Sequence, residues 1–198
     1  MGIQILIPLK RLATVKQRLA PAATAAERER LMLSMLEHVA GAALTSGEGP
    51  VSLASSEPRA GALAASLGVG LVTDGGLPWN EGLVHARELV GADALVGGVL
   101  FLAGDLPLLE PGDVSDLVAA APARGVAIGR AHDGGTNALV VRPADALDPS
   151  FGAPQSAAVH SRLAAAAGLE AVIVDRPGLA LDVDTPDDVV RAGLRLPA

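Results

Sequence analysis

Two lysines close together near the start of the chain are the first residues whose type and spacing suggest chemistry. Of the 15 Lys and Arg residues, the lysines are Lys10 and Lys16, and both directly follow a short apolar run. Every other basic residue in this count is an arginine. Two lysines this close together, beside Arg11, therefore indicate that their charges serve a specific role. Apolar residues between them favour a segment packed on the protein over the alternative, a solvated loop. We interpret this segment as a polyphosphate-binding site.

Three aspartates could complement these lysines. Asp105 follows the most apolar run of the chain, and Asp182 and Asp184 lie near its end. Residues two apart in a strand share a face, so Asp182 and Asp184 are predicted to point the same way. Carboxylates that converge repel one another unless a cation lies between them, and Mg²⁺ prefers such oxygen ligands together with phosphate and water. The alternatives are a turn cap for Asp105 and a polar strand end for the other two.

Composition narrows the classes of partner. The net charge is −7, and the chain has two Phe, one Trp and no Tyr. Nucleic acids and anionic membranes reward a basic surface, and bases also need aromatic side chains on which to stack. We therefore expect neither partner. The apolar run at the N-terminus is too short for a signal peptide, which predicts a cytoplasmic protein.

Several common catalytic arrangements are missing from the sequence. There is no cysteine, so thiolate chemistry and disulfides are excluded. The four histidines lack zinc-type spacing, and neither a Gly-x-Ser-x-Gly elbow nor a glycine-rich phosphate loop is present. Any phosphate site must therefore consist of basic side chains and a metal ion.

The elements that position these residues alternate along the chain. Strands are predicted at 3–7, 50–54, 69–73, 98–103, 125–129, 137–141 and 169–174, and helices at 24–44, 57–67, 80–90, 111–121, 155–167 and 185–194. Such alternation indicates an α/β sandwich with a mostly parallel sheet, formed by one domain spanning residues 1–198. Ligands of such sheets bind beyond the carboxyl ends of the strands. We therefore expect the lysines and the aspartates to meet at one edge.

Five segments in the same order resemble one known family. They are Ile7-Pro-Leu-Lys-Arg-Leu-Ala-Thr-Val-Lys-Gln-Arg-Leu19, Ala103-Gly-Asp-Leu-Pro-Leu-Leu109, Gly134-Gly-Thr-Asn-Ala-Leu139, Phe151-Gly-Ala-Pro-Gln-Ser-Ala-Ala-Val-His160 and Arg176-Pro-Gly-Leu-Ala-Leu-Asp-Val-Asp-Thr-Pro-Asp-Asp188. The chain resembles the phosphoenolpyruvate and 2-phospho-L-lactate guanylyltransferases of coenzyme F-420 biosynthesis, from residue 5 to about residue 190. The resemblance implies a three-layer α/β sandwich with a mostly parallel mixed sheet, the GT-A-like nucleotidyltransferase fold.

The resemblance also implies a role for each site residue. GTP would be bound by Lys10, Arg11, Lys16 and Asn80; the acid substrate by Thr136, Gly152 and Ser156; and Mg²⁺ by Asp105, Asp182 and Asp184. Lys16 and Lys10 would be the catalytic residues.

Two positions depart from the family pattern. Three residues separate Gly152 from Ser156, and Trp79 replaces a more usual leucine, either to pack over the sheet edge or to contact ribose or guanine. His160 shares the helix face of Ser156 and is either a substrate contact or a surface or packing residue.

The implied reaction is attack of a substrate phosphate oxygen on the α-phosphorus of GTP, with release of pyrophosphate. Phosphoenolpyruvate is the expected acid, and 2-phospho-L-lactate and 3-phosphoglycerate are alternatives. The other candidates are a molybdopterin or sugar-phosphate nucleotidyltransferase and a non-catalytic nucleotide-binding module. The protein could act as a homodimer, and the sequence leaves its oligomeric state open.

Overall fold

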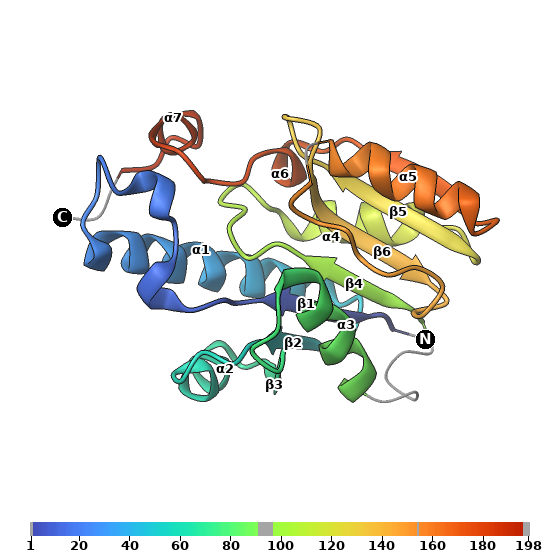
Figure 1. Ribbon diagram of the computed structural model, residues 1–198, viewed down its shortest axis with the longest axis horizontal. Helices are drawn as coiled ribbons and strands as arrows, with labels where there is room; N and C mark the ends of the chain where they lie inside the picture. Colours follow the sequence, from blue (N-terminus) through green and yellow to red (C-terminus); the bar gives the residue numbers. More distant parts are fainter. Residues whose placement is uncertain (1, 91–96, 154, 196–198) are drawn as a thin grey trace.

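Seven strands form one mixed sheet in the computed structural model, which describes residues 2–90, 97–153 and 155–195 (Figure 1). Their order is β3-β2-β1-β4-β6-β5-β7; β6 runs antiparallel to both neighbours, and the other neighbouring pairs are parallel. The strands are β1 (Gln4–Pro8), β2 (Val51–Ala54), β3 (Gly70–Val72), β4 (Val99–Leu102), β5 (Gly125–Arg130), β6 (Thr136–Arg142) and β7 (Glu170–Val174). The predicted α/β fold with a mostly parallel sheet is confirmed.

The helices largely follow the predicted ranges. They are α1 (Ala25–Ser46), α2 (Ala60–Leu67), α3 (Trp79–Val90), α4 (Pro111–Ala120), α5 (Ser156–Ala166), α6 (Pro177–Ala180) and α7 (Pro186–Arg191), with 3₁₀ turns η1 (Leu12–Thr14) and η2 (Gln17–Leu19). The sequence did not predict η1, η2 or α6. The prediction for α2 was wrong at its start, because Glu57 belongs to the preceding turn. Its carboxylate accepts a hydrogen bond from Leu12 N at 3.1 Å, and its own N–H donates to Ser55 Oγ at 3.0 Å.

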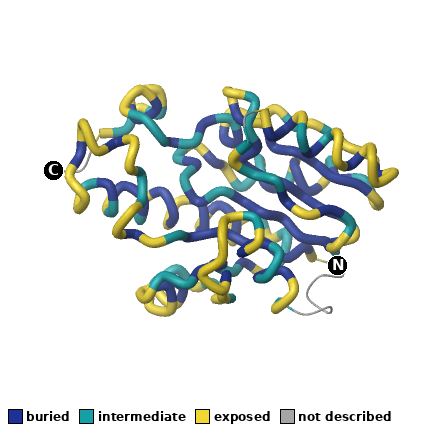
Figure 2. Tube along the Cα trace, in the orientation of Figure 1, coloured by how far each residue is buried: buried dark blue, intermediate teal, exposed yellow. Residues whose placement is uncertain are grey.

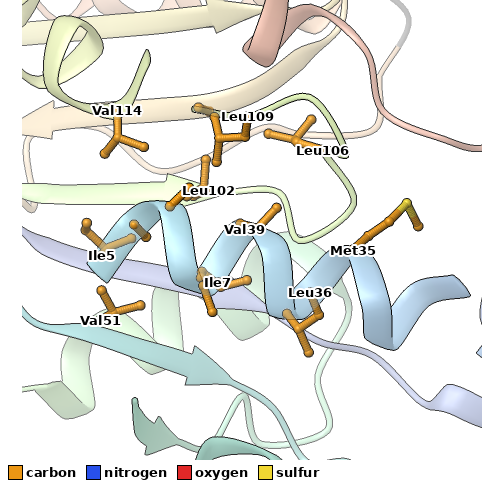
Figure 3. Packing of buried hydrophobic residues seen from close by; sticks show 14 of the residues in the cluster. Ile5, Ile7, Met35, Leu36, Val39, Val51, Leu102, Leu106, Leu109 and Val114 are labelled. Carbon is orange, nitrogen blue, oxygen red and sulfur yellow. The ribbon is translucent and has the colours of Figure 1, made fainter. Parts of the chain in front are cut away.

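Helices cover both faces of the sheet, which gives three layers. Ile5 and Ile7 of β1 point to the face covered by α1 and α4, where they pack with Met35, Leu36 and Val39 (Figure 3). Leu6 lies in the second apolar cluster, together with residues of α3 and α5. This alternation follows from the period of two along a strand. Figure 2 shows that the central strands are buried and that the exposed residues lie mainly on the outer sides of the helices and in the loops.

Capping explains where two of the helices begin. Thr24 Oγ1 accepts a hydrogen bond from Glu27 N at 3.3 Å, and Glu27 returns one by accepting from Thr24 N at 2.6 Å. Thr185 and Asp188 form the same reciprocal arrangement at the start of α7. Each such pair satisfies N–H groups that have no partner within the helix.

In the part of the chain described, no helix combines the length and the apolar character that crossing a bilayer would require.

Candidate active site

A cleft of about 430 Å³ opens at the carboxyl ends of β1 and β4. Its walls include the loop after β1, the turn after β4, the start of β6, the loop before α5 and the segment after α6. Because β6 is antiparallel to β4, its first residues, Thr136 and Asn137, arrive at the edge where β4 ends. Most of the predicted site residues meet here, namely Lys10, Lys16, Asp105, Thr136, Gly152, Asp182 and Asp184.

The three predicted metal ligands form a triad of carboxylates. One oxygen from each of Asp105, Asp182 and Asp184 lies within 4.8 Å of the other two. Val183 is fully buried between Asp182 and Asp184, so both flanking side chains point away from the core toward Asp105. The backbone links the two segments as well, because Val183 N donates to Asp105 O at 3.3 Å. The predicted shared face is therefore present, although this segment lies outside the sheet.

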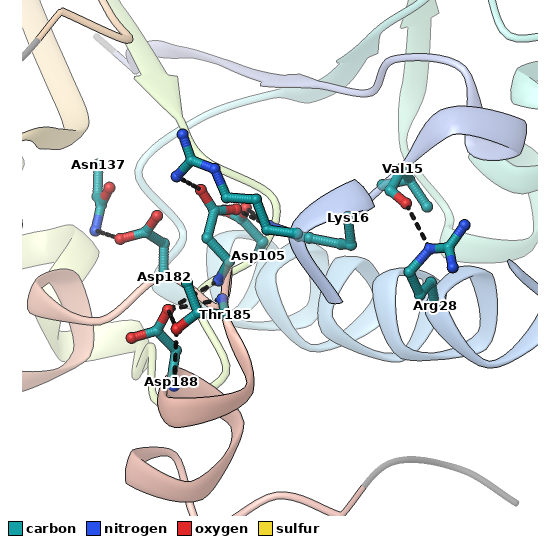
Figure 4. A network of polar contacts seen from close by, with 10 residues as sticks. Val15, Lys16, Arg28, Asp105, Asn137, Asp182, Thr185 and Asp188 are labelled. Carbon is teal, nitrogen blue, oxygen red and sulfur yellow. Dashed lines mark hydrogen bonds and ion pairs between the residues drawn. The ribbon is translucent and has the colours of Figure 1, made fainter. Parts of the chain in front are cut away.

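The electrostatics of the triad favour a cation. Burial raises the pKa of Asp182, and the charges of Asp105 and Asp184 raise it further. Asn137 opposes the shift by donating from Nδ2 to Asp182 Oδ1 at 3.2 Å (Figure 4). Carboxylate oxygens at this spacing suit a hard divalent ion that retains waters and phosphate oxygens. The donor set therefore fits Mg²⁺.

Lys16 extends its ammonium group into this acidic cluster. Its Nζ donates to Asp105 Oδ2 and, at 2.9 Å, to Asp184 Oδ1. Burial alone would lower the pKa of Lys16, but the two aspartates outweigh it and raise the pKa. The residue has φ 52° and ψ 45°, a left-handed conformation that turns the chain between η1 and η2. An ammonium group that is charged at neutral pH thus lies among the carboxylates.

A buried arginine holds the loop that carries Lys16. Arg28 of α1 is 7% exposed, and its Nε donates to Val15 O at 3.3 Å (Figure 4). Its Nη1 donates to Ala23 O at 2.9 Å. Sequence reasoning missed this residue. A signal was present, because Arg28 stands four positions before Met32 and seven before Met35, on the apolar side of the predicted helix.

Lys10 occupies a different part of the cleft. Its Nζ donates to Asp74 Oδ2 at 2.6 Å and to Leu77 O at 2.8 Å, and lies 5.8 Å from the centre of the Trp79 ring. Burial of Asp74 raises its pKa, but bonds from Lys10, Ser56 and Gly76 prevail and lower it. Asp74 was also missed, although it stands just after a predicted strand, where ligand-binding residues are expected. The two lysines are thus held by different carboxylates.

Gly82 of α3 makes room for this pair. A Cβ at that position would lie 3.2 Å from Asp74 Cβ and 3.3 Å from Lys10 Nζ. These separations are tighter than ordinary van der Waals contact, so a side chain would press on the ion pair. The start of α3 therefore shapes the Lys10 side of the cleft.

The predicted acid-binding residues surround a second cleft of about 400 Å³. Its lining shares Thr136, Asn137, Gly152, Asp182 and Asp184 with the first cleft and adds Ser156. Ser156 Oγ donates to Thr136 Oγ1 at 3.2 Å, and both side chains are buried. Gly152 has φ 81°, a conformation that glycine adopts without strain. The triad and the residues that carry the two hydroxyl groups therefore line two neighbouring clefts with a shared wall.

Three of the residues considered in the sequence do not line either cleft. Arg11 is exposed. Asn80 accepts a hydrogen bond from Phe151 N at 2.9 Å and donates to Phe151 O at 3.2 Å, so it holds the loop that carries Gly152. His160 is fully buried behind Thr136. Trp79, in contrast, does line the first cleft and is 38% exposed.

Comparison with known proteins shows which family the chain resembles. The family model described as "Guanylyl transferase CofC like" matches residues 3–194. The chain is 39% identical over 188 residues to a phosphoenolpyruvate guanylyltransferase of Sphaerobacter thermophilus, covering 92% of this chain and 88% of the relative. A protein of the same name from Rubrobacter xylanophilus is 34% identical, with 96% and 93% covered.

A solved structure supports the fold. The putative nucleotide-diphospho-sugar transferase of Desulfovibrio desulfuricans G20 superposes with a TM-score of 0.76 at 20% identity, covering 93% of this chain and 84% of that one. At this level of identity the likeness extends to the fold alone.

Proposed function

The chain belongs to the CofC-like guanylyl transferase family, and from that premise we propose that it condenses GTP with phosphoenolpyruvate. The products are enolpyruvoyl-2-diphospho-5'-guanosine, an intermediate for coenzyme F-420, and pyrophosphate. The observation that carries the proposal is that the two clefts are neighbours with a shared wall. The triad and Lys16 line the first cleft, Ser156 lines the second, and Thr136, Asp182 and Asp184 line both. A triphosphate and a phosphorylated acid could therefore be held side by side.

In this proposal the triphosphate lies over the triad and the lysines. Asp105, Asp182 and Asp184 would hold Mg²⁺, and the ion would supply positive charge to stabilise the phosphate oxygens. Lys16 adds a second positive charge at the same place, and Lys10 anchors phosphate farther along the cleft. Arg11 would reach the phosphates only after rotating from its exposed position, so it contributes least among the proposed GTP contacts. Asn80 acts indirectly by holding the Phe151 loop.

The acid is bound on the Thr136 side of the cleft. The hydroxyls of Thr136 and Ser156 and the backbone around Gly152 bind its phosphate and carboxylate. A phosphate oxygen of the acid attacks the α-phosphorus of GTP; the new P–O bond forms as the bond to the bridging β-phosphate oxygen breaks, and pyrophosphate leaves. The attacking oxygen is already anionic at neutral pH, so no general base is required. Catalysis then comes from positioning and charge stabilisation.

The relatives' printed name and the chemistry of the substrates support two further parts of the proposal. Phosphoenolpyruvate is preferred over 2-phospho-L-lactate and 3-phosphoglycerate because the relatives are named for it. A cytoplasmic location agrees with the cellular supply of GTP and phosphoenolpyruvate.

The test is a pyrophosphate-release assay that crosses four nucleoside triphosphates with three acids in the presence of Mg²⁺. We expect release from GTP with phosphoenolpyruvate well above every other combination. Release with 2-phospho-L-lactate or 3-phosphoglycerate instead would change the substrate and keep the reaction class. Binding of GTP without release from any pair would support the non-catalytic module and overturn the proposal.

A further inference from the structure

His160 is fully buried, and both of its ring nitrogens have partners. Nε2 accepts a hydrogen bond from Ser150 N at 2.8 Å, and Nδ1 lies 3.0 Å from Thr136 Oγ1. The ring also packs edge-on against Phe151, with centroids 5.4 Å apart. The residue lines neither cleft, so it acts on substrate only through its neighbours, and of these Thr136 and Phe151 line the first cleft.

The partner at Nε2 determines the tautomer of the ring. A backbone N–H can only donate, so Nε2 must present its lone pair to Ser150. A neutral imidazole carries one proton, which is then on Nδ1. Burial lowers the pKa of His160 to about 4, although a hydrogen bond with the Ser156 backbone opposes the shift. The ring is therefore neutral at physiological pH, and its one proton, on Nδ1, is available to Thr136 Oγ1 at 3.0 Å, with the Ser156 carbonyl as a second acceptor.

The Thr136 hydroxyl thus accepts two hydrogen bonds. One comes from His160 Nδ1 and the other from Ser156 Oγ at 3.2 Å. A hydroxyl oxygen has two lone pairs and one proton, so both acceptor positions are occupied. Its own proton is left to donate, and Thr136 lines both clefts. An anionic group in the cleft is the partner that such a donor suits.

We propose that His160 is a positioning residue that makes Thr136 an obligatory hydrogen-bond donor to the anionic acid substrate. In the absence of the Nδ1–H bond, the Thr136 hydroxyl could rotate and offer its lone pair to the cleft, which would repel an anion. The inference rests on the proposed function only in taking phosphoenolpyruvate as the acid. It concerns recognition of the acid, so binding of GTP should be independent of His160.

Two substitutions separate positioning from packing. Both His160→Phe and His160→Asn remove the partner of Ser150 N, but the Asn side-chain amide can return an N–H near the position of Nδ1. Thr136→Val removes the hydroxyl at nearly constant shape. Ser161→Ala is a matched control on α5, because its hydroxyl donates only to Ala157 O at 3.0 Å within the helix. Thermal melts establish that each variant is folded.

We expect His160→Phe to raise the KM for phosphoenolpyruvate at least about tenfold, the scale of one hydrogen bond to a charged group. The kcat and the KM for GTP should stay within about threefold. His160→Asn should recover much of the loss, although the smaller side chain packs less well. The double variant with Thr136→Val should be no worse than Thr136→Val alone. Equal losses in the Phe and Asn variants, or additive losses in the double variant, would overturn the inference.

Two measurements do not depend on turnover. A long-range ¹H–¹⁵N correlation spectrum of the wild-type imidazole should place the proton on Nδ1, and a proton on Nε2 would overturn the inference. Calorimetry should show that wild type binds phosphoenolpyruvate more tightly than His160→Phe does. Binding without turnover in wild type would contradict the proposed function alone. Equal binding by wild type and His160→Phe would contradict the inference alone.

Discussion

Lys16 Nζ donates to Asp184 Oδ1 at 2.9 Å, although 168 positions separate the two residues in the chain. The side chain of Lys16 is 5% exposed, and that of Asp184 is 42% exposed. The lysine is therefore enclosed, whereas the carboxylate still faces the cleft. Since Lys16 also contacts Asp105, this lysine and the acidic triad form one electrostatic unit. A change in either part should be felt by the other.

Replacing Lys16 by methionine removes the charge and keeps an unbranched side chain. We expect Lys16→Met to lower kcat/KM by at least about tenfold, because roughly 1.4 kcal/mol of transition-state stabilisation would be lost. Steady-state pyrophosphate release measures the effect. Arg59→Met is the control, since Arg59 pairs at the surface with Glu29. Unchanged kinetics in Lys16→Met would show that Lys16 has only a structural role in its ion pairs.

Asp105→Asn should abolish turnover and leave the fold intact. The substitution keeps the side-chain volume and removes one of the three carboxylate charges that we propose bind Mg²⁺. A calorimetric titration with Mg²⁺ should show that the variant binds the ion more weakly than wild type. The melting temperature should stay close to that of wild type. Asp116→Asn, in an exposed ion pair with Arg176, is the matched control. Normal pyrophosphate release by Asp105→Asn would refute the metal assignment.

We expect Asp74 to affect GTP binding through Lys10, whose ammonium group it holds in place. Lys10→Ala removes the proposed phosphate anchor and should raise the KM for GTP with a smaller change in kcat. Asp74→Asn retains an oxygen that can accept from Lys10 but removes the negative charge that holds the ammonium group. We therefore expect it to raise the KM for GTP as well, by a smaller factor. KM values for both substrates provide the check. A defect in Asp74→Asn without one in Lys10→Ala would show that Asp74 acts on the fold instead.

His160 should make the protein sensitive to mild acid. Its pKa is about 4 in the folded state against an ordinary value of 6.5, so the unfolded chain binds the proton first as the pH falls. Stability should therefore decline from about pH 6.5 to about pH 4, by roughly 3 kcal/mol in total from this residue. Urea unfolding at several pH values measures the decline. The His160→Asn variant should lose less over that window, and an identical decline would contradict the prediction.

The positions of the strands could be predicted from the sequence because each depends on a local pattern. Runs such as Val99–Leu102 are apolar and bounded by turn residues, and every observed strand lies within one residue of its predicted ends. The Thr24 capping box likewise specified the start of α1. Even Asp182 and Asp184 were correctly expected to share a face, since the buried Val183 between them sets the alternation.

The sequence by itself determined which side chains follow the strands, and hence that basic and acidic groups would meet at one sheet edge. Only the tertiary structure decided how they pair. Lys16 joins the triad, Lys10 joins Asp74, and Arg11 stays exposed. It also placed Thr136 beside His160 and Ser156 by making β6 antiparallel. The physical reason is that local patterns specify backbone conformation, whereas pairing depends on strand order and on which distant segments pack together.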